Sequence, residues 1–569
     1  MKRAPSVLDG ALLVGGVTAL SATLAVGVLD ALQPMFNDWP AGAALTLGFG
    51  LWAIIRRLRN RGAPGRPASV CWMLASALWM LSSRDNLGPL PQRVVVLGID
   101  GATWSVIDHE PLPGFARAQR EGARGDLVSM EPMFSPLLWT TMASGKKPDE
   151  HGIRGFHVHA DDCKVARWWD IAEANGQGVG LYKWLVDYPP RSFKTGGFWV
   201  PSWLAPGPET WPAKLAVVKE IELANRLRRK QVGQGNLSIG TAKRLFDVGV
   251  RLSTFAHAAA WVVEERLFRP SEVRRNVAMQ LIRGSVDRDV FIAQLYAAKP
   301  DVASFNYYAT DGLAHLYWSH FQAGGPELRA AYRQADDILT ELLTRRGSQT
   351  RVVLVSDHGF QAMDTKGQAG QFLPLTERLR VRLSQAVAPV DVTRIGHKLV
   401  VGTASAAQAQ RVAAYLPILT DELGAAFYRV ETFPDDPGSL ALTVANEMVT
   451  AERLAHGTVG SEPIADYLKP TEAYTGTHHA RGVILLVGDG ITAGTALGEV
   501  ALLDVAPTIL AAAGLPVGLD LVGRAQGWTE LPRVVSWDSL VPGLVFLDGD
   551  EGSNQEMLES LGYIDDGKQ

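Results

Sequence analysis

Cysteine is scarce in this sequence, which has only Cys71 and Cys163 among its 569 residues. Two cysteines so far apart exclude a disulfide scaffold and a zinc site built from thiolates. An excess of basic residues is also missing, because 55 Lys and Arg stand against 59 Asp and Glu. The net charge of −4 gives no global field for a nucleic-acid polymer, and we expect none as a partner. With 47% hydrophobic and 20% charged residues, the chain is not a disordered one.

Long uncharged runs occur at the amino end of the chain. Gly10–Leu29, Trp39–Ile55 and Ala68–Ser83 contain no Asp, Glu, Lys or Arg. A helix of about 20 residues just crosses a hydrocarbon core of about 30 Å. The third run is short, so the sequence favours three transmembrane helices and leaves two as the alternative. We therefore expect residues 1–88 to form a membrane anchor, with the lipid bilayer as a partner.

Positive charge marks one side of these runs. Lys2 and Arg3 precede the first run, whereas the link from Asp30 to Asp38 is acidic. The link between the second and third runs carries Arg56, Arg57, Arg59, Arg61 and Arg66. The positive-inside rule places the amino end and this arginine link in the cytoplasm. Three spans put the rest of the chain outside and two spans put it inside. We predict a multi-pass protein of the cell membrane with an extracytoplasmic main domain.

From Arg93 onward the pattern is that of an α/β protein. Continuous apolar runs predict strands buried on both faces of a parallel sheet, and helical stretches such as Pro326–Arg345 lie between them. The predicted strands are Val94–Ile99, Asp301–Phe305, Arg351–Ser356 and Val483–Val487. The fold class is thus a doubly wound, mostly parallel sheet with helices on both faces. We expect this domain to cover 89–546, with a helical insertion at about 211–299, a small α/β insertion at about 390–446, and an acidic tail at 547–569.

Carboxylates follow two of the predicted strands directly. Asp100-Gly101 comes after Val94–Ile99, and Asp357-His358-Gly359 comes after Arg351–Ser356. Ligands of open parallel sheets bind beyond the carboxyl ends of the strands, so these side chains can meet at one rim. The alternative for Asp100 alone is an ordinary Asp-Gly turn.

Two further motifs add an Asp and three histidines. Asp311 and His315 are four residues apart, which places both on one face of a helix and suits zinc or a similar cation. Their alternative is a capping Asp and a hydrogen-bonded His. His478 and His479 precede Val483–Val487; such pairs are more often surface residues than ligands.

A hydroxyl-rich block begins at Ser135-Pro136 and continues through Thr140, Thr141 and Gly145. It predicts a helix start whose free N–H groups suit an anion, and a nearby metal would lower the pKa of the Ser135 hydroxyl. A plain N-cap at Ser135 with Pro136 at the first helical position is compatible with the same pattern.

In this order, the motifs resemble those of the alkaline phosphatase superfamily, and within it the type I phosphodiesterase/nucleotide pyrophosphatase family. The resemblance covers about Val94 to Arg524. It rests on Gly98–Gly101, Ser135–Ile153, Asp311–His315, Ser356–Phe360, Gly476–His478, Leu503–Leu510, Gly514–Pro516 and Gly523-Arg524.

The resemblance implies two divalent metal ions, commonly zinc, and a phosphate-ester substrate. The first ion would be bound by Asp100, Asp357, His358 and the oxygen of the nucleophile Ser135. The second would be bound by Asp311, His315 and His478, with His479 as a substitute should His478 point away.

Two departures from the family pattern concern the substrate. Relatives usually have Thr as the nucleophile, where this chain has Ser135. They also carry an Asn that contacts the phosphoryl group, at a place that corresponds to Phe156. Trp184 and the segment 196–203 form either an aromatic cover near the site or part of the core.

The expected function is a membrane-anchored two-metal phosphohydrolase that cleaves phosphodiesters or related esters through a phosphoserine intermediate. The alternatives are a lipid headgroup phosphotransferase of the same superfamily and a non-catalytic binding protein with this fold. Substrate-binding residues and the oligomeric state stay open.

Overall fold

The structure is a computed structural model that describes residues 88–549, except 157–158, 230–237, 269, 364–371, 396, 422, 446–450 and 471–474. The three apolar runs expected to span the membrane, and the acidic tail from 550 onward, lie outside the described residues. Within the described ranges, no helix combines the length and the apolar character that crossing a bilayer requires.

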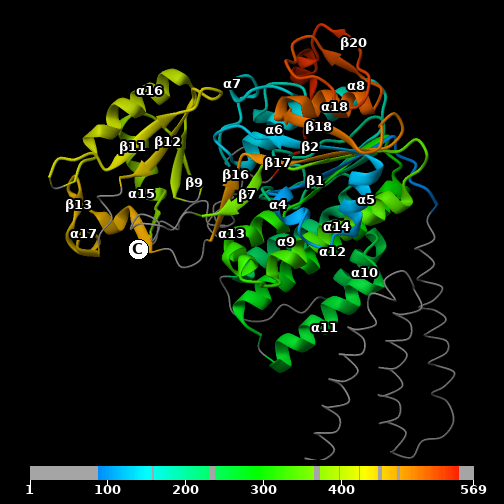
Figure 1. The fold of residues 1–569 in the computed structure, drawn as a ribbon, viewed down its shortest axis with the longest axis horizontal. Coiled ribbons are helices and arrows are strands. Elements are labelled where there is room, and N and C mark those ends of the chain that lie inside the picture. The colour runs from blue at the N-terminus through cyan, green and yellow to red at the C-terminus, as the bar shows by residue number, and fades with distance from the viewer. Residues whose placement is uncertain are drawn as a thin grey trace, which may run out of the picture. The chain divides into compact units, whose positions relative to one another are not determined.

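An eight-stranded sheet forms the centre of the main domain, in the order β18-β2-β17-β6-β1-β5-β3-β4 (Figure 1). Its strands are β1 (Val94–Ile99), β2 (Ala123–Val128), β3 (Val179–Tyr182), β4 (Gly197–Val200), β5 (Val302–Tyr307), β6 (Arg351–Val355), β17 (Arg481–Val487) and β18 (Thr495–Ala501). β1 pairs in parallel with both β5 and β6. The expected mostly parallel sheet is therefore confirmed.

The direction of β17 differs from the prediction. This strand pairs antiparallel with β6 on one side and with β2 on the other, so the sheet is mixed. Its residues from Gly482 to Val487 are all buried. A strand buried on both faces has the same apolar sequence in either direction, which is why the apolar run predicted the strand but not its orientation.

Successive residues of the strands feed two separate cores. Val94 and Val96 belong to one cluster and Val95 and Leu97 to the other, as the alternation of side chains along a strand requires. The first core is covered by α6 (Ser135–Ser144), α8 (Trp168–Ala174) and α18 (Val505–Ala512), and the second by α5 (Pro113–Glu121), α12 (Glu272–Ala297), α13 (Ala309–Gln322) and α14 (Glu327–Arg345) (Figure 1). Helices thus lie on both faces of the sheet.

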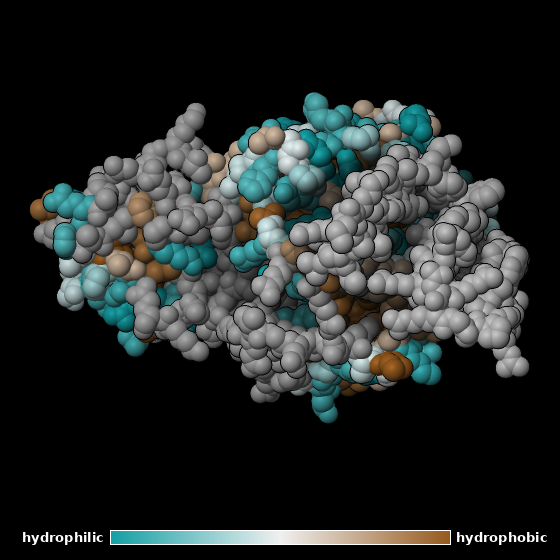
Figure 2. Space-filling view, turned by 90° about the horizontal axis from the view of Figure 1, so that it is seen from below, coloured by the Kyte–Doolittle hydropathy of each residue, from teal (hydrophilic) through white to brown (hydrophobic). Residues whose placement is uncertain are grey.

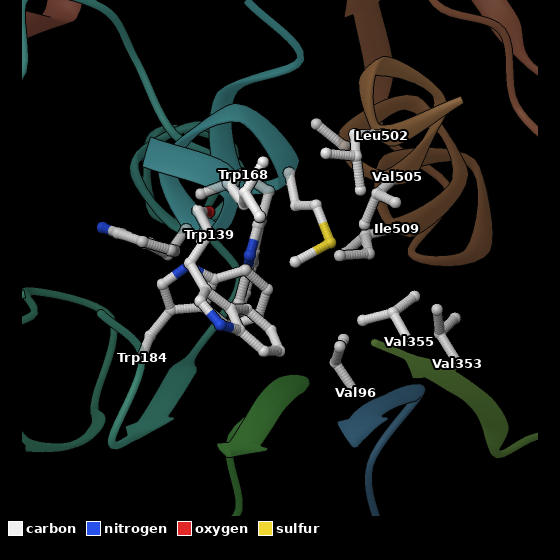
Figure 3. Close-up of a cluster of buried hydrophobic side chains, with 14 of the residues drawn as sticks. Val96, Trp139, Trp168, Trp184, Val353, Val355, Leu502, Val505 and Ile509 are labelled. Carbon is white, nitrogen blue, oxygen red and sulfur yellow. Dashed lines mark hydrogen bonds between the residues drawn. The ribbon is translucent and has the colours of Figure 1, made fainter. Parts of the chain in front are cut away.

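Several tryptophans pack together in the first core (Figure 3). Trp139, Trp168 and Trp184 are fully buried, and Trp184 meets the other two edge to face at ring distances of 5.1 and 5.8 Å. The Trp184 indole also donates to the carbonyl oxygen of Trp139 over 3.0 Å. Trp199 is fully buried as well. Of the two alternatives for these aromatics, the structure therefore has the core and not a cover.

Helices fill the segment between β4 and β5: α9 (Ala216–Arg229), α10 (Ile239–Val248), α11 (Leu252–Phe268) and α12. A buried ion-pair cluster ties them to the sheet, because the Lys183 ammonium lies 2.6 Å from Asp287 and 3.0 Å from Glu222. Leu267 and Phe268 are exposed at the end of α11. In the view from below, brown apolar surface alternates with teal surface among the described residues (Figure 2).

A second, smaller sheet lies within residues 372–470, which we call the small sheet unit. Its order is β11-β12-β10-β9 and every pairing is antiparallel. The elements are α15 (Glu377–Ala386), β9 (Asp391–Ile395), β10 (Lys398–Gly402), α16 (Ala406–Tyr415), β11 (Tyr428–Thr432), β12 (Ser439–Val444) and α17 (Ala451–His456). Leu399, Val401 and Leu442 are buried in a core separate from the two cores of the main sheet.

Candidate active site

Three carboxylates lie at one rim of the main sheet. Asp100 follows β1 and Asp357 follows β6, while Asp311 is in the first turn of α13 after β5. Because β1 lies between β5 and β6 and runs parallel to both, all three strands end at the same edge. The sheet topology alone therefore brings together residues that are up to 257 positions apart.

Asp100, Asp357 and His358 form a first set of ligand atoms, which we call group one. His358 Nε2 lies 3.5 Å from Asp100 Oδ1 and 3.5 Å from Asp357 Oδ2. Their facing atoms are all within 4.8 Å of one another, the spacing of groups that can share a metal ion. These are three of the four ligands that the resemblance implies for the first metal, the fourth being the oxygen of Ser135.

Asp311, His315 and His478 form a second set, group two. Asp311 Oδ1 lies 3.4 Å from the Nε2 atoms of both histidines, and those two nitrogens are 3.0 Å apart. His358 Nε2 is only 3.9 Å from Asp311 Oδ1, so the two groups adjoin. The i, i+4 spacing of Asp311 and His315 on α13 produces the contact that the sequence predicted.

The three histidines share one hydrogen-bonding arrangement. Each Nδ1 faces a backbone carbonyl oxygen: His315 faces Gly476 at 3.2 Å, His358 faces Gly359 at 2.9 Å, and His478 faces Met133 at 2.7 Å. A carbonyl only accepts, so a neutral ring in this setting carries its proton on Nδ1 and keeps its lone pair on Nε2. In all three rings that lone pair belongs to the nitrogen in the ligand group, as in metal-binding histidines.

The reversed strand β17 explains how His478 reaches this rim. His478 lies on β16 (Gly476–His479), just before β17, and pairs with Phe360 of β7 (Gly359–Ala362). Since β17 runs antiparallel, the chain enters it from the edge where the parallel strands end. His478 is buried in group two, whereas its neighbour His479 accepts a hydrogen bond from the Arg481 amide. His479 is therefore not needed as the substitute ligand.

In each carboxylate of group one, one oxygen accepts a hydrogen bond from the protein and the other faces the site. The Trp139 indole N–H donates to Asp100 Oδ2 over 3.1 Å, and the Gly101 amide donates to Asp357 Oδ1 over 3.4 Å. In the part of the chain that the structure describes, the buried polar atoms without a hydrogen-bond partner include Asp100 Oδ1, Asp311 Oδ1, Asp357 Oδ2 and His358 Nε2. Buried acceptors left unpaired are costly, and a cation between them removes that cost. The residues present therefore fit two divalent metal ions.

Sequence reasoning missed Trp139. A signal was available, because Trp139 is four residues after Ser135 and so shares its face of α6. The indole N–H then reaches Asp100 from the same face of the helix.

The pKa shifts of the ligand residues also indicate that the site lacks positive charge to balance its buried carboxylates. Burial, followed by repulsion from the neighbouring carboxylates, raises the pKa of Asp100 and of Asp357 well above the ordinary value. Burial also raises the pKa of Asp311, but the attraction of His315 and His478 and their hydrogen bonds together outweigh it, so the pKa is lowered. Burial and the nearby His478 lower the pKa of His358. Metal ions would stabilise both the ionised carboxylates and the neutral imidazole.

Ser135 lies beside group one. It is buried, and its hydroxyl lowers the pKa of both Asp100 and Asp357 through hydrogen bonding. The prediction that Ser135 is the N-cap is wrong by one position, because the cap is Phe134 and the helix begins at Ser135. The hydroxyl is therefore not the cap of its own helix, and it lies close enough to Asp100 and Asp357 to lower the pKa of both.

The other hydroxyls of the block face away from the carboxylates. Thr140 donates to the Pro136 carbonyl over 2.7 Å, as expected for a threonine inside a helix. Thr141 contacts His151 Nε2 at 3.1 Å, and His151 Nδ1 accepts from the Ile153 amide. Burial lowers the pKa of His151 to about 3, so it is neutral and structural.

Phe156 is the residue at which the resemblance to the family leads us to expect an Asn. It is buried, with its ring 6.0 Å from Phe134 and 6.1 Å from Trp203. Phe134 immediately precedes Ser135, so the neighbourhood of the hydroxyl is apolar on this side. An amide donor for a phosphoryl oxygen is not supplied from this position.

Comparison with known proteins gives a family match over residues 94–441, to type I phosphodiesterase / nucleotide pyrophosphatase. A search of curated protein sequences returned no match. Among solved structures, human ectonucleotide pyrophosphatase / phosphodiesterase 5 is 11% identical, with a TM-score of 0.42 over 78% of this chain and 97% of that one. Phosphonoacetate hydrolase from Sinorhizobium meliloti is 14% identical, with a TM-score of 0.42 over 75% and 96%. The family match spans more than half of the chain, and it shows that the chain is a hydrolase of the type I phosphodiesterase / nucleotide pyrophosphatase family, in the alkaline phosphatase superfamily.

Proposed function

We propose that this family member is a two-metal phosphohydrolase that cleaves phosphodiesters or related phosphate esters through a phosphoserine intermediate. The observation that carries the proposal is the pair of adjoining, buried ligand groups at the rim of the sheet, with the buried Ser135 beside group one. Group one would hold one ion and group two the other, with zinc suited to both because each offers carboxylate and imidazole ligands. When bound, such ions supply positive charge to the phosphoryl oxygens and lower the pKa of a nearby hydroxyl.

The residues of the chain define the order of bond changes. The Ser135 oxygen forms a bond to phosphorus while the bond to the leaving group breaks, and the leaving group departs with the electron pair. The leaving-group oxygen takes up the proton that Ser135 loses. Water then attacks the phosphorus, the bond between phosphorus and the Ser135 oxygen breaks, a water proton restores the hydroxyl, and the phosphate product leaves. The position of Ser135 in the first turn of α6 supports an anionic substrate, because the positive end of a helix dipole attracts phosphate.

Substitution of Ser135 tests this function. Ser135→Ala should keep both metal ions and the fold but lose several orders of magnitude in kcat on a chromogenic phosphodiester, and Ser135→Thr should keep partial activity. Thr140→Ala is the matched control, since its hydroxyl is bonded within the helix. Near wild-type turnover by Ser135→Ala, with loss in Thr140→Ala, would show that the nucleophile is misassigned. Transfer of the phosphoryl group to a lipid acceptor instead of water would favour the phosphotransferase alternative.

We further propose that residues 1–88 anchor the protein in the cell membrane and that the catalytic domain is extracytoplasmic. The support is in the sequence: three uncharged runs and an arginine-rich link between the last two. A reporter that is active only outside the cytoplasm, fused after Gly88, should be active. Silence of that reporter, with activity of a cytoplasmic reporter at the same position, would overturn the topology.

A further inference from the structure

The segment that follows the nucleophile helix is held by the small sheet unit. It runs from Lys147 through α7 (Pro148–His151) to Phe156. Arg154 in this segment forms an ion pair with Asp436 of the small sheet unit, with Nε 2.7 Å from Oδ1. The Asp436 side chain is 0% exposed and that of Arg154 is 13% exposed. Breaking such a pair leaves an uncompensated buried charge, unlike the loss of an exposed pair.

Glycines on both sides make room for this contact. A Cβ at Gly438 would lie 2.6 Å from Arg154 Nε, and one at Gly402 would lie 2.8 Å from the Arg154 carbonyl oxygen. Real Cβ atoms essentially never come this close, so a side chain at Gly438 would displace the Arg154 guanidinium and one at Gly402 would displace its backbone. Asp436 Oδ1 also accepts from the Gly438 amide at 3.3 Å. The small sheet unit therefore has a site whose shape and charge match the Arg154 side chain.

The next two residues, Gly155 and Phe156, also contact the small sheet unit, at Asp391. The Phe156 amide donates to Asp391 Oδ2 over 3.2 Å. A Cβ at Gly155 would lie 2.0 Å from the same oxygen, so the backbone approaches Asp391 as closely as glycine allows. Three consecutive residues, Arg154 to Phe156, are thus fixed by a unit whose residues are absent from both metal-ligand groups.

The consequence reaches Ser135 through aromatic packing. With its backbone fixed at Asp391, the Phe156 ring packs between Phe134 and Trp203. Phe134 caps α6, whose first residue is Ser135. A shift of Phe156 would therefore move the start of this helix or open the wall beside the hydroxyl.

We propose that Arg154 and Asp436 are positioning residues, which hold Phe156 as a wall beside the nucleophile. The inference rests on the proposed role of Ser135. It assigns the small sheet unit a part in catalysis without contact to substrate or metal. Misplacement of a reacting group by about 1 Å can cost up to about 100-fold in rate, so a loosened wall should lower kcat measurably.

Asp436→Asn tests the inference in the full chain with a chromogenic phosphodiester. We expect kcat to fall about tenfold, with two metal ions retained per chain. Arg154→Lys keeps the positive charge but loses the Nε donor, so its kcat should fall by less than that of Asp436→Asn. The matched control is Asp421→Asn, in the same unit, where Asp421 is buried and pairs with Arg453 at 2.9 Å. A tenfold loss in Asp421→Asn as well would show a general effect of unit stability and overturn the inference.

A double-mutant cycle separates positioning from stability. Phe156→Ala should lower kcat by itself, and Asp436→Asn should then cost less than twofold when added to it, because the wall through which Asp436 acts is gone. A further tenfold loss in the double variant would overturn the inference. Failure of the proposed function is a different result, namely full activity in Ser135→Ala.

Discussion

Trp139 allows the metal-binding arrangement to be tested without changing a ligand. Its indole N–H donates to Asp100 Oδ2 over 3.1 Å in a fully buried position. Trp139→Phe keeps an aromatic ring but removes the donor, so Asp100 loses the contact that orients its other oxygen towards His358. A hydrogen bond to a charged group contributes about 1.5–3 kcal/mol. At about 1.4 kcal/mol per factor of ten, the affinity for the group-one ion should fall about 10- to 100-fold.

Trp168→Phe is the control for the packing that is lost when an indole is replaced by a smaller ring. Trp168 is fully buried in the same core, and within the described residues its indole nitrogen has no hydrogen-bond partner. Both variants lose similar packing, about 1–2 kcal/mol in the free energy of unfolding. Only Trp139→Phe loses a contact to a ligand.

The measurement is zinc bound per chain after dialysis against a series of buffered free-zinc concentrations. Trp139→Phe should lose one ion at concentrations where the wild type and Trp168→Phe hold two. Two ions bound with unchanged affinity would refute the role of the indole, and an equal loss in Trp168→Phe would trace the effect to the core.

Three further results are expected. His315→Ala should reduce bound metal towards one ion per chain and remove most activity; two ions at full occupancy would make His315 a packing residue. Burial raises the pKa of Asp187 to about 7, so ionisation of this carboxyl lowers the free energy of unfolding as pH rises from about 4 to 7. Asp187→Asn removes the buried charge and should therefore raise Tm at pH 8 more than at pH 5. Burial lowers the pKa of His151 to about 3, so the free energy of unfolding falls by about 1.4 kcal/mol for each pH unit below 6.5 as the unfolded chain takes up a proton. Urea denaturation at several pH values should therefore show a free energy of unfolding that depends less steeply on pH in His151→Gln than in the wild type.

The rim of the sheet was predictable because its residues depend on local rules. The strand Val94–Ile99 has the predicted bounds, and Asp100 and Asp357 occupy positions fixed by strand ends. The Asp311–His315 contact follows from helical spacing alone. These features need only the chain nearby and the rule that parallel strands share an edge.

The remaining features depend on partners that the sequence does not bring together. The direction of β17 is set by its neighbours β2 and β6, and the sequence of a doubly buried strand does not encode it. Arg154 and Asp436 are 282 residues apart, and neither belongs to a motif. The proton position on each histidine depends on a backbone carbonyl that only the folded chain supplies.

The placement of β17 also has a consequence for how this protein is made. The strand lies between β2 and β6, which both precede it in the chain, so the centre of the sheet stays divided until residue 487 has been synthesised. Pairing at such sequence separation is slow, and the exposed edges of β2 and β6 favour aggregation while it is pending. His478 reaches group two by the same insertion. A complete set of ligands in group two therefore requires that β17 has been inserted and the sheet has closed.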